Sequence, residues 1–162
     1  MKHIEYLRKA NEVARRSCAG GNTPFGAILV DEDGEVLMEQ GNAEHELHDA
    51  TAHAERVLAS RASAAFDKKR LWGCTLYTTC EPCPMCTGAI YWANIGKIAF
   101  GISETKLLEL TGADDKNPTF NMGADKVIAA GQKKIEVLGP FQEIEEELVE
   151  VHKGFWDPDN HA

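Results

Sequence analysis

Two short motifs contain residue types that bind metal ions. Residues 53–55 (HAE) place an imidazole two positions before a carboxylate, and residues 82–86 (PCPMC) place two thiols three positions apart. Side chains three residues apart share one face of a helix, so Cys83 and Cys86 can bind the same ion. A helix N-terminus favours the thiolate form that a metal ion requires. The pair of thiols therefore predicts part of a metal site.

The third ligand has to come from elsewhere, and His53 is the best candidate. Two helices that begin on the same side of a layered sheet bring their N-termini together. Three protein ligands and one open position are typical of a catalytic zinc site. Bound Zn²⁺ lowers the pKa of its water to about 7. We predict one Zn²⁺ per chain, held by His53, Cys83 and Cys86, with Glu55 as the catalytic acid–base group.

Two other chemistries use the same thiols. A redox Cys-x-x-Cys motif requires neither His53 nor Glu55. A structural zinc requires a fourth protein ligand, for which Cys80 and His48 are available. The remaining polar residues of segment 44–49, including His45 and Glu44, are expected to be solvated.

Composition limits the class of protein. The chain has 162 residues, a net charge of −9 and 43% apolar residues, which favours one globular domain over residues 1–162. No apolar run approaches the roughly 18 to 20 residues of a membrane span. The first residues lack the apolar region of a secretory signal, so we expect a cytoplasmic protein. The acidic charge makes nucleic acid an unfavourable partner.

Helix-like and strand-like segments alternate along the chain. Apolar spacing predicts helices over 2–19, 51–65, 82–94 and 141–156, with shorter helical segments at 106–110 and 124–131. Strands are predicted over 24–31, 35–41, 74–79, 97–102 and 133–139, and Asp33-Gly34 marks a hairpin between the first two. Strands separated by helices pair in parallel. We therefore predict an α/β protein, a three-layer α/β/α sandwich with a five-stranded mixed sheet.

The two metal-binding motifs together resemble a known family. His-x-Glu followed by Pro-Cys-x-x-Cys is the general signature of zinc-dependent base deaminases, and the chain resembles the cytidine deaminase-like superfamily from its first helix to about residue 115. Segments 24–27 (PFGA), 41–42 (GN) and 75–78 (TLYT) support the resemblance. Segments 80–86 and 88–93 are similar to bacterial guanine deaminases, as is 112–115 (GADD), although alanine stands there for phenylalanine.

The resemblance implies hydrolytic loss of an exocyclic amine from a nucleobase, with guanine to xanthine, a step of purine salvage, as the leading reaction. Cytosine or another small aminopyrimidine or aminotriazine is the alternative, and adenosine in transfer RNA is a weaker one. A zinc-stabilised binding domain without turnover is the alternative outside enzymes, and Glu55 argues against it. The candidate substrate contacts are Asn42, Phe25, Ala54, Asp114, Asp115, Trp92, Phe155 and Trp156.

The last part of the chain departs from the guanine deaminases. Residues 154–158 (GFWDP) follow an acidic helix and carry two aromatic side chains. We hypothesise that the tail 154–162 covers the pocket, within one chain or across a dimer. The resemblance implies a homodimer, for which residues 90–95 offer apolar side chains that would otherwise belong to the core.

Overall fold

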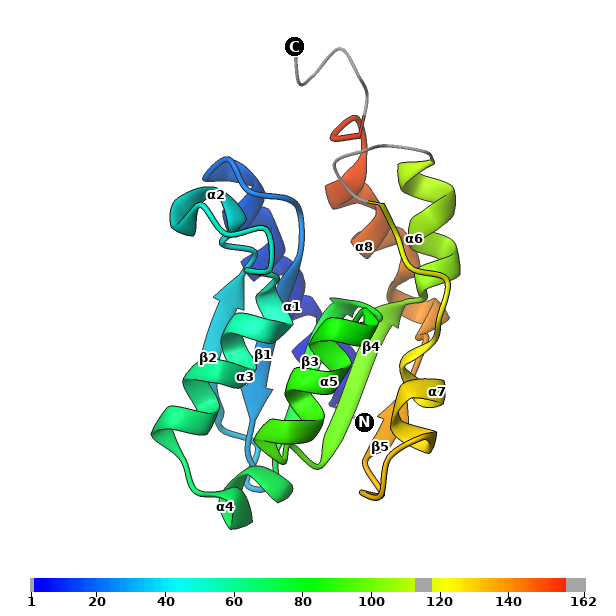
Figure 1. Ribbon diagram of the computed structural model, residues 1–162. Coiled ribbons are helices and arrows are strands. Elements are labelled where there is room, and N and C mark those ends of the chain that lie inside the picture. Colours follow the sequence, from blue (N-terminus) through cyan, green and yellow to red (C-terminus); the bar gives the residue numbers. More distant parts are fainter. Residues whose placement is uncertain (1, 113–117, 157–162) are drawn as a thin grey trace.

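A five-stranded mixed sheet forms the centre of the molecule (Figure 1). The computed structural model describes residues 2–112 and 118–156. The strand order is β2-β1-β3-β4-β5. The strands are β1 (Gly26–Val30), β2 (Val36–Gly41), β3 (Thr75–Cys80), β4 (Lys97–Ile102) and β5 (Glu136–Leu138).

Strand directions follow from the connections between strands. β1 pairs antiparallel with β2 and with β3, whereas β3, β4 and β5 are parallel. The predicted turn joins β1 to β2: the Asp31 carboxylate accepts hydrogen bonds from the backbone N–H groups of Asp33 and Glu35, and Gly34 has a φ of +88°. Helices connect the parallel strands, as such connections require. The predicted hairpin and the mixed sheet are both confirmed.

Helices cover both faces of the sheet (Figure 1). Helices α3 (Ala54–Ala65), α5 (Pro84–Ala93) and α7 (Ala124–Ala129) lie on one face, with α4 (Lys68–Trp72) at its end. Helices α1 (His3–Ala19) and α8 (Glu145–His152) lie on the other face, and the 3₁₀ turn η1 (Gln142–Ile144) leads into α8. Helices α2 (Glu44–Leu47) and α6 (Glu104–Thr111) lie at one end of the sheet. This arrangement confirms the three-layer sandwich.

The sheet separates two hydrophobic clusters. Leu58, Leu76 and Ile90 belong to the cluster under α3 and α5. Leu7, Ile28 and Leu148 belong to the cluster under α1 and α8. All six side chains are at most 1% exposed, so burial of both faces fixes the register of the central strands.

Short elements differ from the sequence-based expectation. Segment 42–51, expected as a loop, contains the single turn of α2, which ends at His48 with a φ of +50°. Helix α4 begins after Asp67, whose carboxylate accepts the backbone N–H of Arg70 at 2.8 Å. The predicted final helix is divided into η1 and α8. None of the described helices is long and apolar enough to cross a bilayer.

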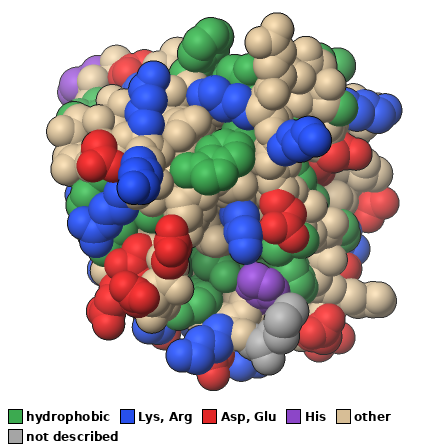
Figure 2. All heavy atoms as spheres, turned by 90° about the horizontal axis from the view of Figure 1, so that it is seen from below, with side chains coloured by type: hydrophobic (Ala, Val, Ile, Leu, Met, Phe, Trp, Pro, Cys, Tyr) green, Lys and Arg blue, Asp and Glu red, His purple; other side chains and the backbone are tan. Residues whose placement is uncertain are grey.

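The end of the molecule that carries α4 is seen face-on in Figure 2. Basic and acidic side chains are interspersed there around a few apolar ones. Charges of opposite sign therefore offset one another on this face, instead of adding to a field of one sign.

Candidate metal centre and pocket

The site lies at the edge of the sheet where two parallel strands end. β3 ends at Cys80 and β4 at Ile102, and these two residues are paired. Helices α3 and α5 begin at the same edge, with His53 and Cys83 immediately before their first residues. A cavity of about 450 Å³ opens there, within the size range of ligand pockets. Its lining residues are Phe25, Asn42, Glu44, Ala50, His53, Glu55, Cys80, Glu81, Cys83, Met85, Glu104, Leu107, Pro118, Thr119 and Phe120.

Among the described residues, His53, Cys83 and Cys86 form a group that can hold a metal ion. Their ligand atoms lie within 4.8 Å of one another, and Cys83 Sγ is 3.8 Å from His53 Nδ1. One imidazole nitrogen and two sulfurs are a donor set that zinc prefers. The sequence predicts that the N-termini of these two helices meet, and the packing of α3 against α5 brings them together.

Protonation within the group favours metal binding at Cys83. Hydrogen bonds from the Cys86 thiol and from His53 lower the pKa of Cys83 to about 4. The same bonds leave the protons on the partners: the pKa of His53 is raised to about 9, first by its bond to Cys83, and the pKa of Cys86 is raised by its bond to Cys83 and by burial. Zinc binding therefore has to release protons from His53 and Cys86.

Glu55 is a buried carboxylate beside this group. Its side chain lies in the first turn of α3, is 7% exposed and lines the cavity. Burial raises the pKa of Glu55 to about 7, with a smaller contribution from Cys83. A carboxyl group with a pKa near 7 can both take up and release a proton at neutral pH.

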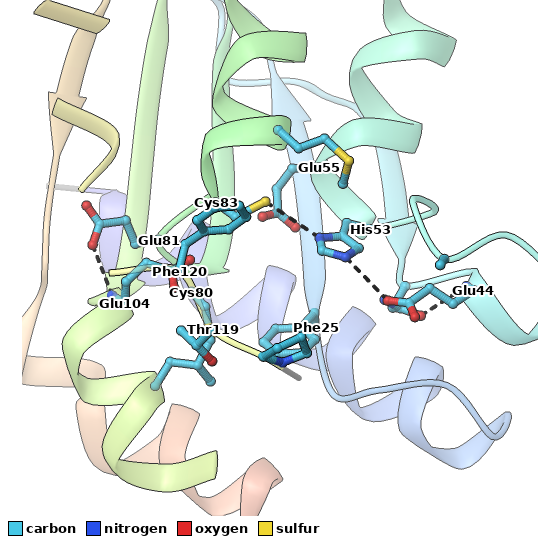
Figure 3. Close-up of a pocket in the computed structure, with 15 residues that line it drawn as sticks. Phe25, Glu44, His53, Glu55, Cys80, Glu81, Cys83, Glu104, Thr119 and Phe120 are labelled. Carbon is cyan, nitrogen blue, oxygen red and sulfur yellow. Dashed lines mark hydrogen bonds and ion pairs between the residues drawn. The ribbon is translucent and has the colours of Figure 1, made fainter. Parts of the chain in front are cut away.

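A second carboxylate orients His53 (Figure 3). Glu44 Oε1 is 3.5 Å from His53 Nε2, and the same oxygen accepts a hydrogen bond from Asn42 Nδ2 at 2.9 Å. The Asn42 side chain in turn accepts the backbone N–H of Glu44 at 3.1 Å. Carboxylates on the far nitrogen of a metal-binding histidine fix its ring and its tautomer. Glu44 was expected at the surface, but it lies in the pocket wall.

A third carboxylate, Glu81, fastens the loops around the cavity. Glu81 Oε1 accepts the backbone N–H of Glu104 at 3.0 Å, and Oε2 accepts that of Ala124 at 2.9 Å. These N–H groups belong to the first residues of α6 and α7, so one side chain satisfies both helix starts. Glu81 therefore holds the starts of α6 and α7 at the pocket.

The opposite wall of the cavity includes Phe25, which packs against the C-terminal part of the chain. The Phe25 and His152 rings pack edge to face with their centroids 5.4 Å apart, and the centroids of the Phe25 and Trp156 rings are 6.2 Å apart. Trp156 Nε1 donates to His152 Nδ1 at 3.0 Å, and His152 Nε2 lies 3.8 Å from Cys80 Sγ. Burial lowers the pKa of His152 to about 4, so the ring is neutral. Residues 152–156 thus support the wall from behind.

The other predicted site residues are placed as follows. Ala54 is fully buried in the core, and Trp92 is 76% exposed and is not among the residues that line the cavity. Phe155 packs edge-on against Trp156. Asp114 and Asp115 lie outside the described residues. Neither of the alternative zinc ligands belongs to the metal-binding group. His48 is exposed at the end of a helix, and Cys80 faces His152.

Among the charged and aromatic residues of the site, the sequence analysis did not predict Glu44, Glu81, Glu104, Phe120 and His152. A signal existed for two of them. Glu81 follows β3 and Glu104 follows β4, and the carboxyl ends of neighbouring parallel strands meet at one edge. His152 gives no such signal, because a histidine in an acidic amphipathic helix is usually solvated.

Comparisons with known proteins agree with this geometry. Residues 1–102 match the family described as the cytidine and deoxycytidylate deaminase zinc-binding region. A probable cytosine deaminase of Schizosaccharomyces pombe is 41% identical, over 96% of this chain and 93% of its own. A tRNA-specific adenosine deaminase of Aquifex aeolicus is 40% identical, over 62% of this chain and 66% of its own.

Guanine deaminase of Bacillus subtilis is similar in sequence and in structure. It is 40% identical over 71% of this chain and 73% of its own. Its crystal structure superposes with a TM-score of 0.63 at the same coverage. Because the family match includes both metal-binding motifs and the fold agrees, the chain belongs to the zinc-dependent cytidine and deoxycytidylate deaminase family.

Proposed function

We propose that the protein removes an exocyclic amino group from a free nucleobase by hydrolysis, and that cytosine is the preferred base. The observation that carries this proposal is the composition of the cavity, which joins the metal-binding group and Glu55 to a wall supported by the C-terminal residues. The similarity to the S. pombe protein covers 96% of the chain and so includes α8. The sequence similarity to the guanine deaminase of B. subtilis leaves more than a quarter of the chain unmatched.

His53, Cys83 and Cys86 hold the zinc ion in this proposal. Bound zinc supplies an acidified water at neutral pH. Glu55 would carry the protons of the reaction: one proton of the attacking water would go to the ring nitrogen beside the reacting carbon, and the other would go to the amino group, which leaves as ammonia. Its pKa of about 7 suits both directions of transfer.

Aromatic side chains account for recognition of a flat ring. Phe25 and Phe120 line the cavity from different parts of the chain (Figure 3). Aromatic faces stack on any base, so they contribute affinity without choosing among bases. Asn42 adds an amide at the cavity wall, where it is 3% exposed. Selection of the base therefore depends on the polar groups around its edge.

Guanine, converted to xanthine, is the second candidate. Segments 80–86 and 88–93 support it, and so does the similarity to the B. subtilis enzyme. Asp114 and Asp115 are the proposed partners of the N–H groups of guanine, because carboxylates form strong charge-assisted hydrogen bonds.

The test is ammonia release by the zinc-loaded protein from cytosine, cytidine, guanine, guanosine, adenine, ammeline and transfer RNA. We expect the highest kcat/KM with cytosine. A preference for guanine would favour the second candidate and leave the roles of zinc and Glu55 unchanged. Turnover of transfer RNA alone would contradict the free-base proposal. No turnover at all, with one zinc bound per chain, would contradict an enzymatic role on these substrates.

A further inference from the structure

Glu104 carries a carboxylate that the fold itself does not use. It is the first residue of α6, its side chain is 5% exposed, and it lines the cavity. Glu104 Oε2 is buried and has no hydrogen-bond partner among the described residues. A buried polar atom without a partner costs about 1 to 3 kcal/mol, and more when the group is charged. A carboxylate kept in this position calls for a partner other than the residues that the structure describes.

Helix capping does not explain the side chain. Acidic residues in a first helical turn usually interact favourably with the helix dipole. Here the Ser103 hydroxyl already accepts the backbone N–H of Lys106 at 3.1 Å, and Glu81 accepts the N–H of Glu104 itself. The start of α6 is thus complete without the Glu104 carboxylate.

Glu44 and Glu81 are carboxylates of the same cavity, and both have partners within the chain. Glu44 contacts His53 and Asn42, and it lies on the other side of the metal-binding group from Glu104 (Figure 3). Glu81 uses both of its oxygens on backbone N–H groups. Of these three carboxylates, Glu104 alone keeps a buried oxygen that no described residue contacts by a hydrogen bond, and it does so inside the pocket.

The chemistry of the group fits the edge of a nucleobase. Burial, with smaller contributions from the nearby Cys83, Glu55 and Glu81, raises the pKa of Glu104 to about 8. A carboxyl group in this state either accepts an N–H or donates to a ring nitrogen or carbonyl oxygen. Amide-like edges of bases present an N–H next to a carbonyl oxygen. A desolvated carboxyl group is therefore complementary to such an edge.

We propose that Glu104 is a substrate-binding residue that selects the base, by hydrogen bonding through Oε2 to a ring N–H on an edge away from the departing amine. This proposal rests on the proposed function. It implies a substrate class: amino-substituted heterocycles with a free ring N–H. Methylation of that nitrogen removes the donor and places a methyl group against the carboxylate.

The experiment compares wild type with Glu104→Met and Glu104→Gln in the zinc-loaded, full-length protein. Methionine keeps the approximate shape without the acceptor, and glutamine keeps a neutral acceptor. Glu109→Gln is the matched control, because Glu109 lies on the same helix and is exposed. Steady-state kinetics are measured with cytosine and guanine and with 1-methylcytosine and 9-methylguanine, in which the ring N–H away from the departing amine is blocked. Binding of each base by calorimetry, zinc content and Tm are measured as well.

We expect Glu104→Met to raise KM and Kd by about 10- to 100-fold, with Glu104→Gln in between and the control unchanged. The preference for a base over its N-methyl derivative should decrease in the same order. Zinc content should stay at one per chain. The Tm of Glu104→Met should be equal to or above that of wild type, because a buried carboxyl group without a partner is removed.

The outcomes separate this proposal from the proposed function. If wild type releases ammonia and Glu104→Met has the same KM, Kd and methyl selectivity, the role of Glu104 is overturned and the function stands. If wild type binds bases but releases no ammonia, the proposed function fails, and the binding constants of the variants decide the role of Glu104. If no base binds to wild type, both are overturned.

Discussion

The cavity has two walls that are held in different ways. The metal wall, formed by His53, Glu55, Cys83 and Cys86 with Glu44 behind them, consists of groups that contact one another at short range. The wall that we propose to bind substrate, here called the substrate wall, is formed by Phe25, Glu104 and Phe120 with His152 and Trp156 behind them. It has an aromatic ring that is 58% exposed and a carboxylate oxygen without a partner among the described residues. The groups of the metal wall therefore engage one another, whereas the substrate wall keeps groups that the described part of the chain leaves unengaged.

The largest expected effect comes from the metal wall. Glu55→Gln removes the proton carrier but keeps the size of the side chain. We expect kcat to fall by about 100- to 10,000-fold, the usual contribution of general acid–base catalysis. Zinc content, measured by atomic absorption, should not change. A kcat equal to that of wild type would show that proton transfer does not depend on Glu55.

Trp156→Ala tests the support behind the substrate wall. Trp156 is 7% exposed and packs on Phe25 and His152, so we expect a loss of about 3 kcal/mol in the free energy of unfolding. Trp92→Ala is the control, since the Trp92 ring is 76% exposed and a surface change of this kind costs about 0.5 kcal/mol or less. If urea denaturation shows the same loss in the free energy of unfolding for both variants, the C-terminal residues do not support the substrate wall.

The same wall should respond to acid through His152. Its pKa is lowered to about 4 by burial, while an unfolded histidine has a pKa of about 6.5. The unfolded chain therefore binds the proton more tightly, and stability is lost as the pH falls from about 6.5 to about 4. The difference corresponds to about 3 kcal/mol. In a His152→Gln variant, this part of the pH dependence of unfolding should disappear; if it persists, other groups are responsible.

Glu44→Gln gives the smallest effect and probes the metal wall from behind. Loss of the charge that faces His53 Nε2 should weaken zinc binding by about 10- to 100-fold, as measured by competition with a chromophoric chelator. Glu46→Gln is the control, because Glu46 lies on the same helix and contacts Asn22 instead. Unchanged zinc affinity in Glu44→Gln would show that His53 is oriented by packing alone.

The two walls also differ in how far the sequence predicts them. The four residues of the metal wall, His53, Glu55, Cys83 and Cys86, lie in two local motifs at helix starts. Spacing along the chain defines each motif, and the packing of two helices that begin at the same edge brings the motifs together. Phe25, Glu104 and His152 come from three distant elements, and their contacts depend on how α6 and α8 pack on the sheet. The hairpin and the mixed sheet follow from turn residues and from the alternation of strands with helices, whereas the single turns of α2 and α4 depend on local capping at Asp67 and on tertiary contacts.

The hydrogen bonds of Glu81 have a consequence for how this protein can diversify. One buried carboxylate ties the starts of α6 and α7 to the end of β3, so the positions of both helices do not depend on the length of chain between them. The entropy of closing a loop grows only slowly with its length, by about 0.6 kcal/mol for each doubling. Residues between the end of α6 and the start of α7 can therefore be inserted, deleted or exchanged at small cost to folding. New substrate preferences can arise in this segment while the metal wall stays as it is.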